Sequence, residues 1–99
     1  MSNLPSLPHI NVVGSIMTGT HGSGIHNPAM SNFVSQVAFV DPEGKQKRLT
    51  RQNNGEDFTR FLHSFGALGL VYQMSMDIMD EFAVKKCIYK DVPFDKLFQ

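Results

Sequence analysis

Apolar and polar residues alternate most regularly over residues 70–78. One side of this segment carries Leu70, Tyr72, Met74, Met76 and Ile78, and the other side carries residues 71, 73, 75 and 77. A period of two predicts a β-strand, because successive side chains of an extended chain point to opposite faces. Residues 33–40 predict a second strand, rich in β-branched and aromatic residues on both faces, as in a buried strand.

A hairpin is predicted after the second of these strands. Residues 41–44 read DPEG, with aspartate, proline and glycine at the positions that a type I turn favours. Residues 45–51 are mostly polar and charged, which suits an edge strand. A further strand is predicted over residues 82–89, and residues 92–98 look like the start of a helix.

The spacing of Phe58, Phe61, Leu62 and Phe65 predicts one apolar face of a helix. Residues 53–57 supply capping and acidic residues for its start, and Gly66 is its expected stop before a tight passage over residues 66–69. Residues 12–17 are long enough for one or two helical turns. Together these elements predict an α+β fold, a mainly antiparallel sheet with one or two helices.

The composition fits one small domain, with 99 residues of which 41% are hydrophobic. Nine basic residues balance nine acidic ones, so nucleic acid is an unexpected partner. We expect the basic run at residues 45–48, together with Arg51, to lie on the surface. The single cysteine allows no internal disulfide and favours a reducing, cytoplasmic location.

The ends of the chain carry no recognisable targeting signal. Residues 1–8 have neither the charge nor the apolar run of a signal peptide or a membrane span. Both ends read as if the chain were a piece of a larger one.

The segment MTGTHGSG, residues 17–24, has three competing interpretations. It is an ordinary turn-rich loop, a setting for a catalytic or metal-binding histidine, or a backbone cradle for a ligand. Its spacing matches neither the Rossmann nor the Walker phosphate-binding motif. Glycines let backbone N–H groups approach a ligand, and the hydroxyl groups add donors, so a phosphate or a flat polar ring would suit this surface.

The other reactive side chains favour structural interpretations. His9, His21, His26 and His63 match no familiar metal spacing, and we expect no metal site. Ser23 beside His21 lacks the nucleophile elbow and orienting carboxylate of a hydrolase. Cys87 is expected to be a buried small side chain within a strand.

Three linked blocks resemble one known family. They are residues 4–10 (LPSLPHI), residues 13–24 (VGSIMTGTHGSG) and residues 64–71 (SFGALGLV). The chain is similar to the second half of the FAD-binding domain of flavoprotein oxidases of the vanillyl-alcohol oxidase type. It looks most like the alditol (xylitol) oxidases and sugar-lactone oxidases. The resemblance implies that residues 1–80 are the incomplete second lobe of that domain, and that residues 81–99 form a strand and linker toward a missing cap domain.

The resemblance also implies site residues. By this carry-over Thr18, Gly19, Thr20 and His21 would run against FAD with their backbone amides facing it. Four further positions would contact the cofactor: Asn11, Gly14, Leu70 through its main chain, and Ser6, which would also touch a polyol substrate. Relatives often have serine at the position of Asn11, and this change would preserve a backbone contact but remove a hydroxyl contact.

The chemistry implied by the resemblance is hydride transfer from an alcohol, a polyol or a sugar lactone to flavin, with oxygen as acceptor. No catalytic residue is expected in this chain, because the family's covalent-FAD histidine lies upstream and its acid and base residues lie in the cap domain. The chain alone would then be inactive and, with its lobe surface open, would self-associate. The alternative is a non-catalytic binding or assembly module that keeps the fold without flavin.

Overall fold

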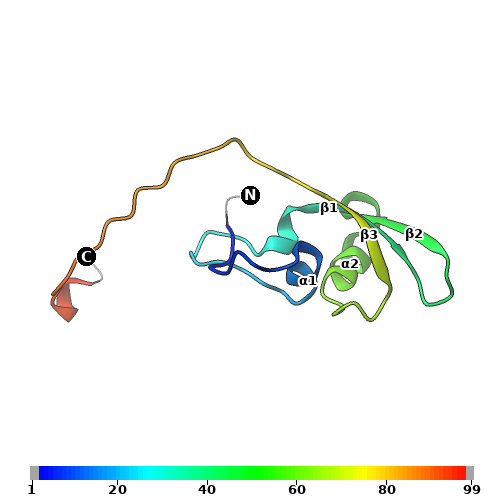
Figure 1. Cartoon of the computed structure of the whole chain (residues 1–99), viewed down its shortest axis with the longest axis horizontal. Helices are drawn as coiled ribbons and strands as arrows, with labels where there is room; N and C mark the ends of the chain where they lie inside the picture. Colours follow the sequence, from blue (N-terminus) through cyan, green and yellow to red (C-terminus); the bar gives the residue numbers. More distant parts are fainter. Residues whose placement is uncertain (1–2, 98–99) are drawn as a thin grey trace.

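The computed structural model describes residues 3–97. It contains a three-stranded antiparallel sheet in the order β2-β1-β3, with helices beside it (Figure 1). The strands are β1 (Val34–Val40), β2 (Gln46–Thr50) and β3 (Leu70–Met76), and the helices are α1 (Val12–Met17) and α2 (Arg51–Leu62), with 3₁₀ turns η1 (Met30–Phe33) and η2 (Phe94–Lys96). The expected α+β class is confirmed.

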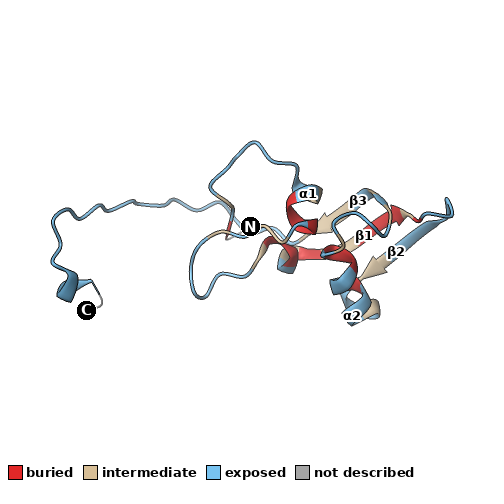
Figure 2. Cartoon of the chain, turned by 90° about the horizontal axis from the view of Figure 1, so that it is seen from below, coloured by how far each residue is buried: buried red, intermediate tan, exposed pale blue. Residues whose placement is uncertain are grey.

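The core lies between the central strand and the two helices, where Figure 2 shows the buried residues. Val34, Val37 and Phe39 of β1 pack with Phe58, Phe61 and Leu62 of α2 and with Ile16 and Met17 of α1. The rings of Phe39 and Phe61 are 4.1 Å apart at their centroids. Burying a large apolar side chain stabilises a fold by about 1.5–3 kcal/mol. The apolar positions at 58, 61 and 62 therefore dock α2 on the sheet as their spacing predicts.

The predicted hairpin joins β1 to β2. The Gly44 N–H donates to the Asp41 carbonyl at 2.9 Å, which closes the turn. The Asp41 carboxylate accepts from the Lys45 N–H at 2.8 Å and pairs with the Lys47 ammonium at 2.8 Å. Residues 45–48 are exposed, as expected for an edge strand.

Strand β3 is confirmed, but the prediction that its apolar residues all lie on one face is wrong. Ala38 pairs with Gln73 and Phe39 pairs with Val71, which leaves Tyr72 as an additional residue in a bulge. Because a bulge interrupts the alternation, Val71 joins Met74 and Met76 against the core. Leu70 and Tyr72 are exposed, and so is Ile78, which lies beyond the strand.

Helix α2 has different boundaries from the predicted ones. The Thr50 hydroxyl caps its start by accepting from the Asn53 N–H at 3.2 Å, so the helix begins before the predicted capping loop. Gly55, with φ of 43°, forms a kink inside it. The helix ends at Leu62 rather than near Gly66. Phe65 takes a positive φ of 55° and is 78% exposed, so its placement on the buried face was wrong.

Arg51 is a structural clamp and not part of the predicted edge strand. Its guanidinium donates to the carbonyls of Ser31 at 3.0 Å and Asn32 at 2.7 Å, and twice to the carbonyl of Val34, at 2.6 and 3.1 Å. It also lies 5.8 Å from the centre of the Phe58 ring. These contacts tie the first turn of α2 to η1 and to the start of β1.

The chain leaves the sheet after β3. The Asp77 N–H donates to the Phe33 carbonyl at 2.7 Å, and residues 77–97 are then exposed and run away from the body in an extended path (Figure 1). The strand predicted over residues 82–89 is not formed, because no described strand edge lies beside it to complete its hydrogen bonds. The helix start predicted over residues 92–98 is present only as η2, and residue 98 lies outside the described residues.

The extended segment gives the molecule its length of 59 Å and a radius of gyration of 17.5 Å, where a compact chain of this size measures about 13 Å. No helix within residues 3–97 is long and apolar enough to cross a membrane.

Removing the clamp should destabilise the fold. Arg51→Ala leaves three carbonyl groups without their charged donor, and hydrogen bonds to charged groups each contribute about 1.5–3 kcal/mol. We expect urea denaturation to show a loss of about 1–3 kcal/mol in unfolding free energy. Arg48→Ala, an exposed position in β2, is the matched control and should change it by less than about 0.5 kcal/mol. Equal effects of the two variants would contradict the clamp.

The turn should make stability sensitive to acid. The Lys47 ammonium and then the Lys45 N–H hold the pKa of the Asp41 carboxyl below its usual range. A lowered folded-state pKa gives stability that is complete above the unfolded value of about 3.9 and is lost as pH falls through the lowered value. The Asp41 carboxylate in turn raises the pKa of the Lys47 ammonium. The stability that Lys47 contributes is therefore lost only when the pH rises through that raised value.

We therefore expect the urea midpoint of the native chain to decrease when the pH is lowered from 5 to 2, and to decrease by more than the midpoint of Asp41→Asn. This pH range brackets the usual Asp pKa of about 3.9. Asp95→Asn, an exposed position in the tail, should keep the native profile. Identical pH profiles for the native chain and Asp41→Asn would show that the ion pair adds nothing to stability.

Candidate functional site

The short helix α1 presents several of the predicted site residues on one support. Asn11 caps it, with its side-chain oxygen accepting from the Gly14 N–H at 3.2 Å. The Ser15 hydroxyl donates to the Asn11 carbonyl at 2.7 Å. Ile16 and Met17 are buried in the core, so α1 is fixed to the body although it has only six residues.

Thr18, Gly19 and Thr20 close the end of α1. Their N–H groups donate to the carbonyls of Gly14 at 3.1 Å, Ile16 at 3.1 Å and Ser15 at 2.8 Å, respectively. The Thr18 hydroxyl lies 3.0 Å from the Gly14 carbonyl and 3.3 Å from the Thr20 hydroxyl. These three N–H groups are therefore engaged in the helix cap. The resemblance implies that they face a cofactor, but in this structure none of them is free to donate to one.

The free amides begin at His21. The N–H groups of residues 21–24 donate to no acceptor within residues 3–97. His21 is exposed, and its Nδ1 lies 2.8 Å from the Gly22 carbonyl. Asn27 stabilises the loop, because its side chain donates to the Ser23 carbonyl at 2.9 Å. This four-residue stretch is thus a row of unpaired donors on a supported loop.

Gly22 is required for a steric reason. A Cβ atom added there would overlap the side-chain oxygen of Asn3 and approach the Leu4 carbonyl to 2.6 Å. Asn3 is buried and donates from its side chain to the Pro28 carbonyl at 3.2 Å. The loop therefore packs closely against the Asn3 side chain and the Leu4 carbonyl. Sequence reasoning missed Asn3, because nothing in the pattern around it marks it as buried.

The segment after Asn3 borders an apolar pocket of about 290 Å³. Its walls are Leu4, Pro5, Leu7, Pro8, Ile10, Val12 and Met30. Ser6, the predicted substrate contact, is exposed between two of these lining residues in the sequence. The pocket, the loop and α1 therefore adjoin one another. Apart from Ser6 and Leu70, every predicted site residue lies in the loop or in α1 and its caps.

Leu70 lies apart from that group. Leu70 pairs with Val40 at one end of β1. Segment η1, which contacts α1, leads into the opposite end of β1. The tight passage before it is real, since a Cβ atom at Gly69 would come within 2.5 Å of the Val40 carbonyl oxygen. Gly19 instead adjoins His63 at the end of α2, with 4.0 Å between an added Cβ and the His63 ring.

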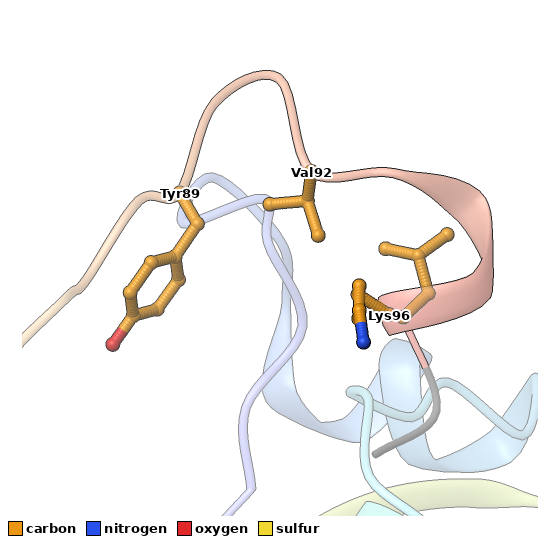
Figure 3. Close-up of a pocket in the computed structure, with 4 residues that line it drawn as sticks. Tyr89, Val92 and Lys96 are labelled. Carbon is orange, nitrogen blue, oxygen red and sulfur yellow. The ribbon is translucent and has the colours of Figure 1, made fainter.

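The remaining reactive side chains form no second site. Within residues 3–97 no three histidine, cysteine or acidic side chains come together in a group able to hold a metal. Cys87 is exposed in the tail, so its expected burial was wrong. A larger, open pocket of about 740 Å³ is lined only by tail residues, among them Tyr89, Val92 and Lys96 (Figure 3). It contains none of the predicted site residues.

Comparison of the sequence with known proteins identifies the enzymes to which this chain is related. The chain is homologous to one segment of the sugar-alcohol and sugar-lactone oxidases, and this confirms the expected resemblance. It is 37% identical to the alditol oxidase of a Streptomyces species over 94% of this chain. It is 29% identical to the D-arabinono-1,4-lactone oxidases of Kluyveromyces lactis and Saccharomyces cerevisiae, over 86% of this chain in each case.

The match covers a limited part of those enzymes. The chain spans 22% of the alditol oxidase and 16% of each of the two lactone oxidases. No family model matches the chain.

The two glycines on either side of the helix cap give a matched test of this geometry. Gly22→Ala should lower the unfolding free energy by about 1–3 kcal/mol, because the new methyl group would overlap the segment of Asn3 and Leu4. Gly14→Ala adds its methyl group 3.9 Å from the nearest atom, on the exposed side of α1, and should leave stability unchanged or raise it by up to about 1 kcal/mol. Equal stability of both variants in urea denaturation would contradict the close packing of the loop.

Proposed function

We propose that the chain is the second lobe of the FAD-binding domain of an oxidoreductase that oxidises an alcohol, a polyol or a sugar lactone. The observation that carries the proposal is the 37% identity to alditol oxidase across nearly the whole chain. On this proposal residues 1–80 contribute the lobe, and residues 81–99 lead toward a substrate-binding domain. The chain alone lacks catalytic residues and is inactive.

The loop after α1 suits the polar parts of a dinucleotide cofactor. The N–H groups of residues 21–24 are unpaired donors, and backbone donors in a glycine-rich loop favour phosphate oxygens and flat polar rings. Bound FAD would supply the hydride acceptor and pass the electrons on, with oxygen as the proposed final acceptor. The loop and α1 would hold the cofactor in place.

Asn11 and Gly14 would line the cofactor from the exposed side of α1. The absence of a side chain at Gly14 leaves the surface open there, which is the condition for close approach of a ligand. Thr18, Gly19 and Thr20 would act by shaping the end of the helix, since their N–H groups are already engaged. The role of Leu70 rests on the resemblance alone.

Ser6 would contact the substrate. Ser6 is exposed, and its sequence neighbours Pro5 and Leu7 line the apolar pocket, so a polyol held at that pocket would have a hydroxyl group within the same segment. The acid and base groups for the reaction would come from outside this chain.

A second candidate function is a binding or assembly module without flavin. The observation that favours it is the tail of residues 77–97, which is exposed along its length and offers apolar side chains to a partner. The two candidates differ in whether the loop binds FAD.

We expect FAD added to the ¹⁵N-labelled chain to shift the amide signals of residues 21–24 and of Gly14, and to leave those of residues 80–90 in place. Gly14→Ala should weaken this binding about tenfold or more, because its methyl group occupies the approach surface, while Gln52→Ala on exposed α2 should not. Chemical-shift titration by NMR measures both effects. The absence of any shift in the loop at saturating FAD would reject the flavin proposal for this chain and favour the module.

A further inference from the structure

The tail after β3 carries a large apolar surface that nothing in the described chain covers. Ile78 is 86% exposed, Val84 is 80% exposed and Ile88 is 69% exposed. The backbone is extended and forms no strand, so its N–H and C=O groups between residues 78 and 88 are unpaired with one another and with the sheet. An extended apolar segment with unpaired backbone groups is a strand lacking a neighbour.

The charges of this segment are arranged symmetrically about Ala83. Residues 78–88 read IMDEFAVKKCI, with Asp80 and Glu81 on one side and Lys85 and Lys86 on the other. If two copies pair in an antiparallel direction with Ala83 opposite Ala83, each Asp80 lies opposite a Lys86 and each Glu81 opposite a Lys85. None of these four side chains makes an ion pair within residues 3–97. The pairing would give four ion pairs between the two copies.

The apolar residues obey the same symmetry. In this register Phe82 lies opposite Val84 and Ile78 lies opposite Ile88, so both residues of each pair share one face of the ribbon. Opposite apolar pairs and opposite charges each stabilise an antiparallel pair. Four exposed apolar side chains of each copy would thus gain an apolar neighbour from the other copy.

The charges also disfavour the competing arrangements. Parallel pairing in register would place the acidic residues of the two copies together and the lysines together. A shift of the antiparallel register by two residues would place Lys86 opposite Phe82 and leave all four charged residues without partners. Direct like-charge contacts destabilise a strand pair, which disfavours the parallel arrangement. An antiparallel shift by one residue keeps only two of the four ion pairs, so the register centred on Ala83 gives the largest number of ion pairs among these arrangements.

We propose that residues 78–88 form a two-fold, antiparallel strand pair with the same segment of a second copy of this chain. The interface is isologous, since the same residues of both copies meet across the symmetry axis at Ala83. A lone two-stranded ribbon is only marginally stable in water, so the association is weak and depends on protein concentration and salt. This inference is independent of FAD binding, because it uses no residue of the loop or of α1.

Charge exchange tests whether the charges of residues 78–88 control the association. Asp80→Lys with Glu81→Lys makes all four charged positions basic, and Lys85→Glu with Lys86→Glu makes them all acidic. Each double variant alone should lose self-association by about tenfold or more in dissociation constant, measured by sedimentation equilibrium at high concentration. An equimolar mixture of the two should regain association, because every opposite pair is complementary again. Both variants alter only exposed tail residues, so the fold of the body serves as the internal control.

Three results would overturn the proposal. Association of either double variant alone at the strength of the native chain would place the contact elsewhere, for example on the free edge of β3. Failure of the mixture to associate more strongly than its components would show that the charges do not select the partner. A native chain that stays monomeric at every accessible concentration would also reject it.

A cross-link tests the symmetry axis. In the proposed register two cysteines at position 83 lie opposite each other with Cα atoms about 4.5–5.5 Å apart, within the range of a disulfide. The native Cys87 residues of the two copies would lie eight positions apart, about 26 Å along the ribbon. Ala83→Cys in a Cys87→Ser background should therefore form a covalent dimer under mild oxidation, and the native chain should not. Equal rates for the two would contradict the register.

Discussion

The packing of β1 against α2 is the contact on which the rest of the structure depends. Strand β1 is the central strand, and its residues Val34, Val37 and Phe39 reach the core from one face. Phe61 meets Phe39 across this contact, and α1 joins the same core through Ile16. The helix that carries the candidate site therefore has no independent stability: six residues are too few for a helix in water, and only burial against this core holds it.

The local elements of the fold could be predicted from the sequence where one residue type has one dominant effect. The turn at residues 41–44 needs proline and glycine at fixed positions, and the buried side of α2 follows from the spacing of its phenylalanines. The errors arose where a tertiary contact decided the outcome. The bulge at Tyr72 depends on pairing with β1, and the early start of α2 depends on the Thr50 cap and on carbonyls that Arg51 binds far along the chain. No periodicity within either segment contains that information.

In the candidate site, too, local features could be predicted from the sequence, whereas features set by tertiary contacts could not. The glycine-rich composition of residues 17–24 marked a loop with free backbone donors, and the structure contains such a row. The helical turns expected over residues 12–17 are present as α1, but the sequence did not show that the cap of this helix engages the amides of Thr18 to Thr20. The burial of Asn3 and its contact with Gly22 join segments about twenty residues apart, and only the folded chain brings them together.

The contact at Gly22 links two surfaces that are otherwise separate. One side of it is the donor loop, and the other is the stretch after Asn3, whose next residue, Leu4, lines the apolar pocket. A side chain at position 22 would have to displace both Asn3 and Leu4. A single substitution there would therefore alter the donor loop and the wall of the apolar pocket together.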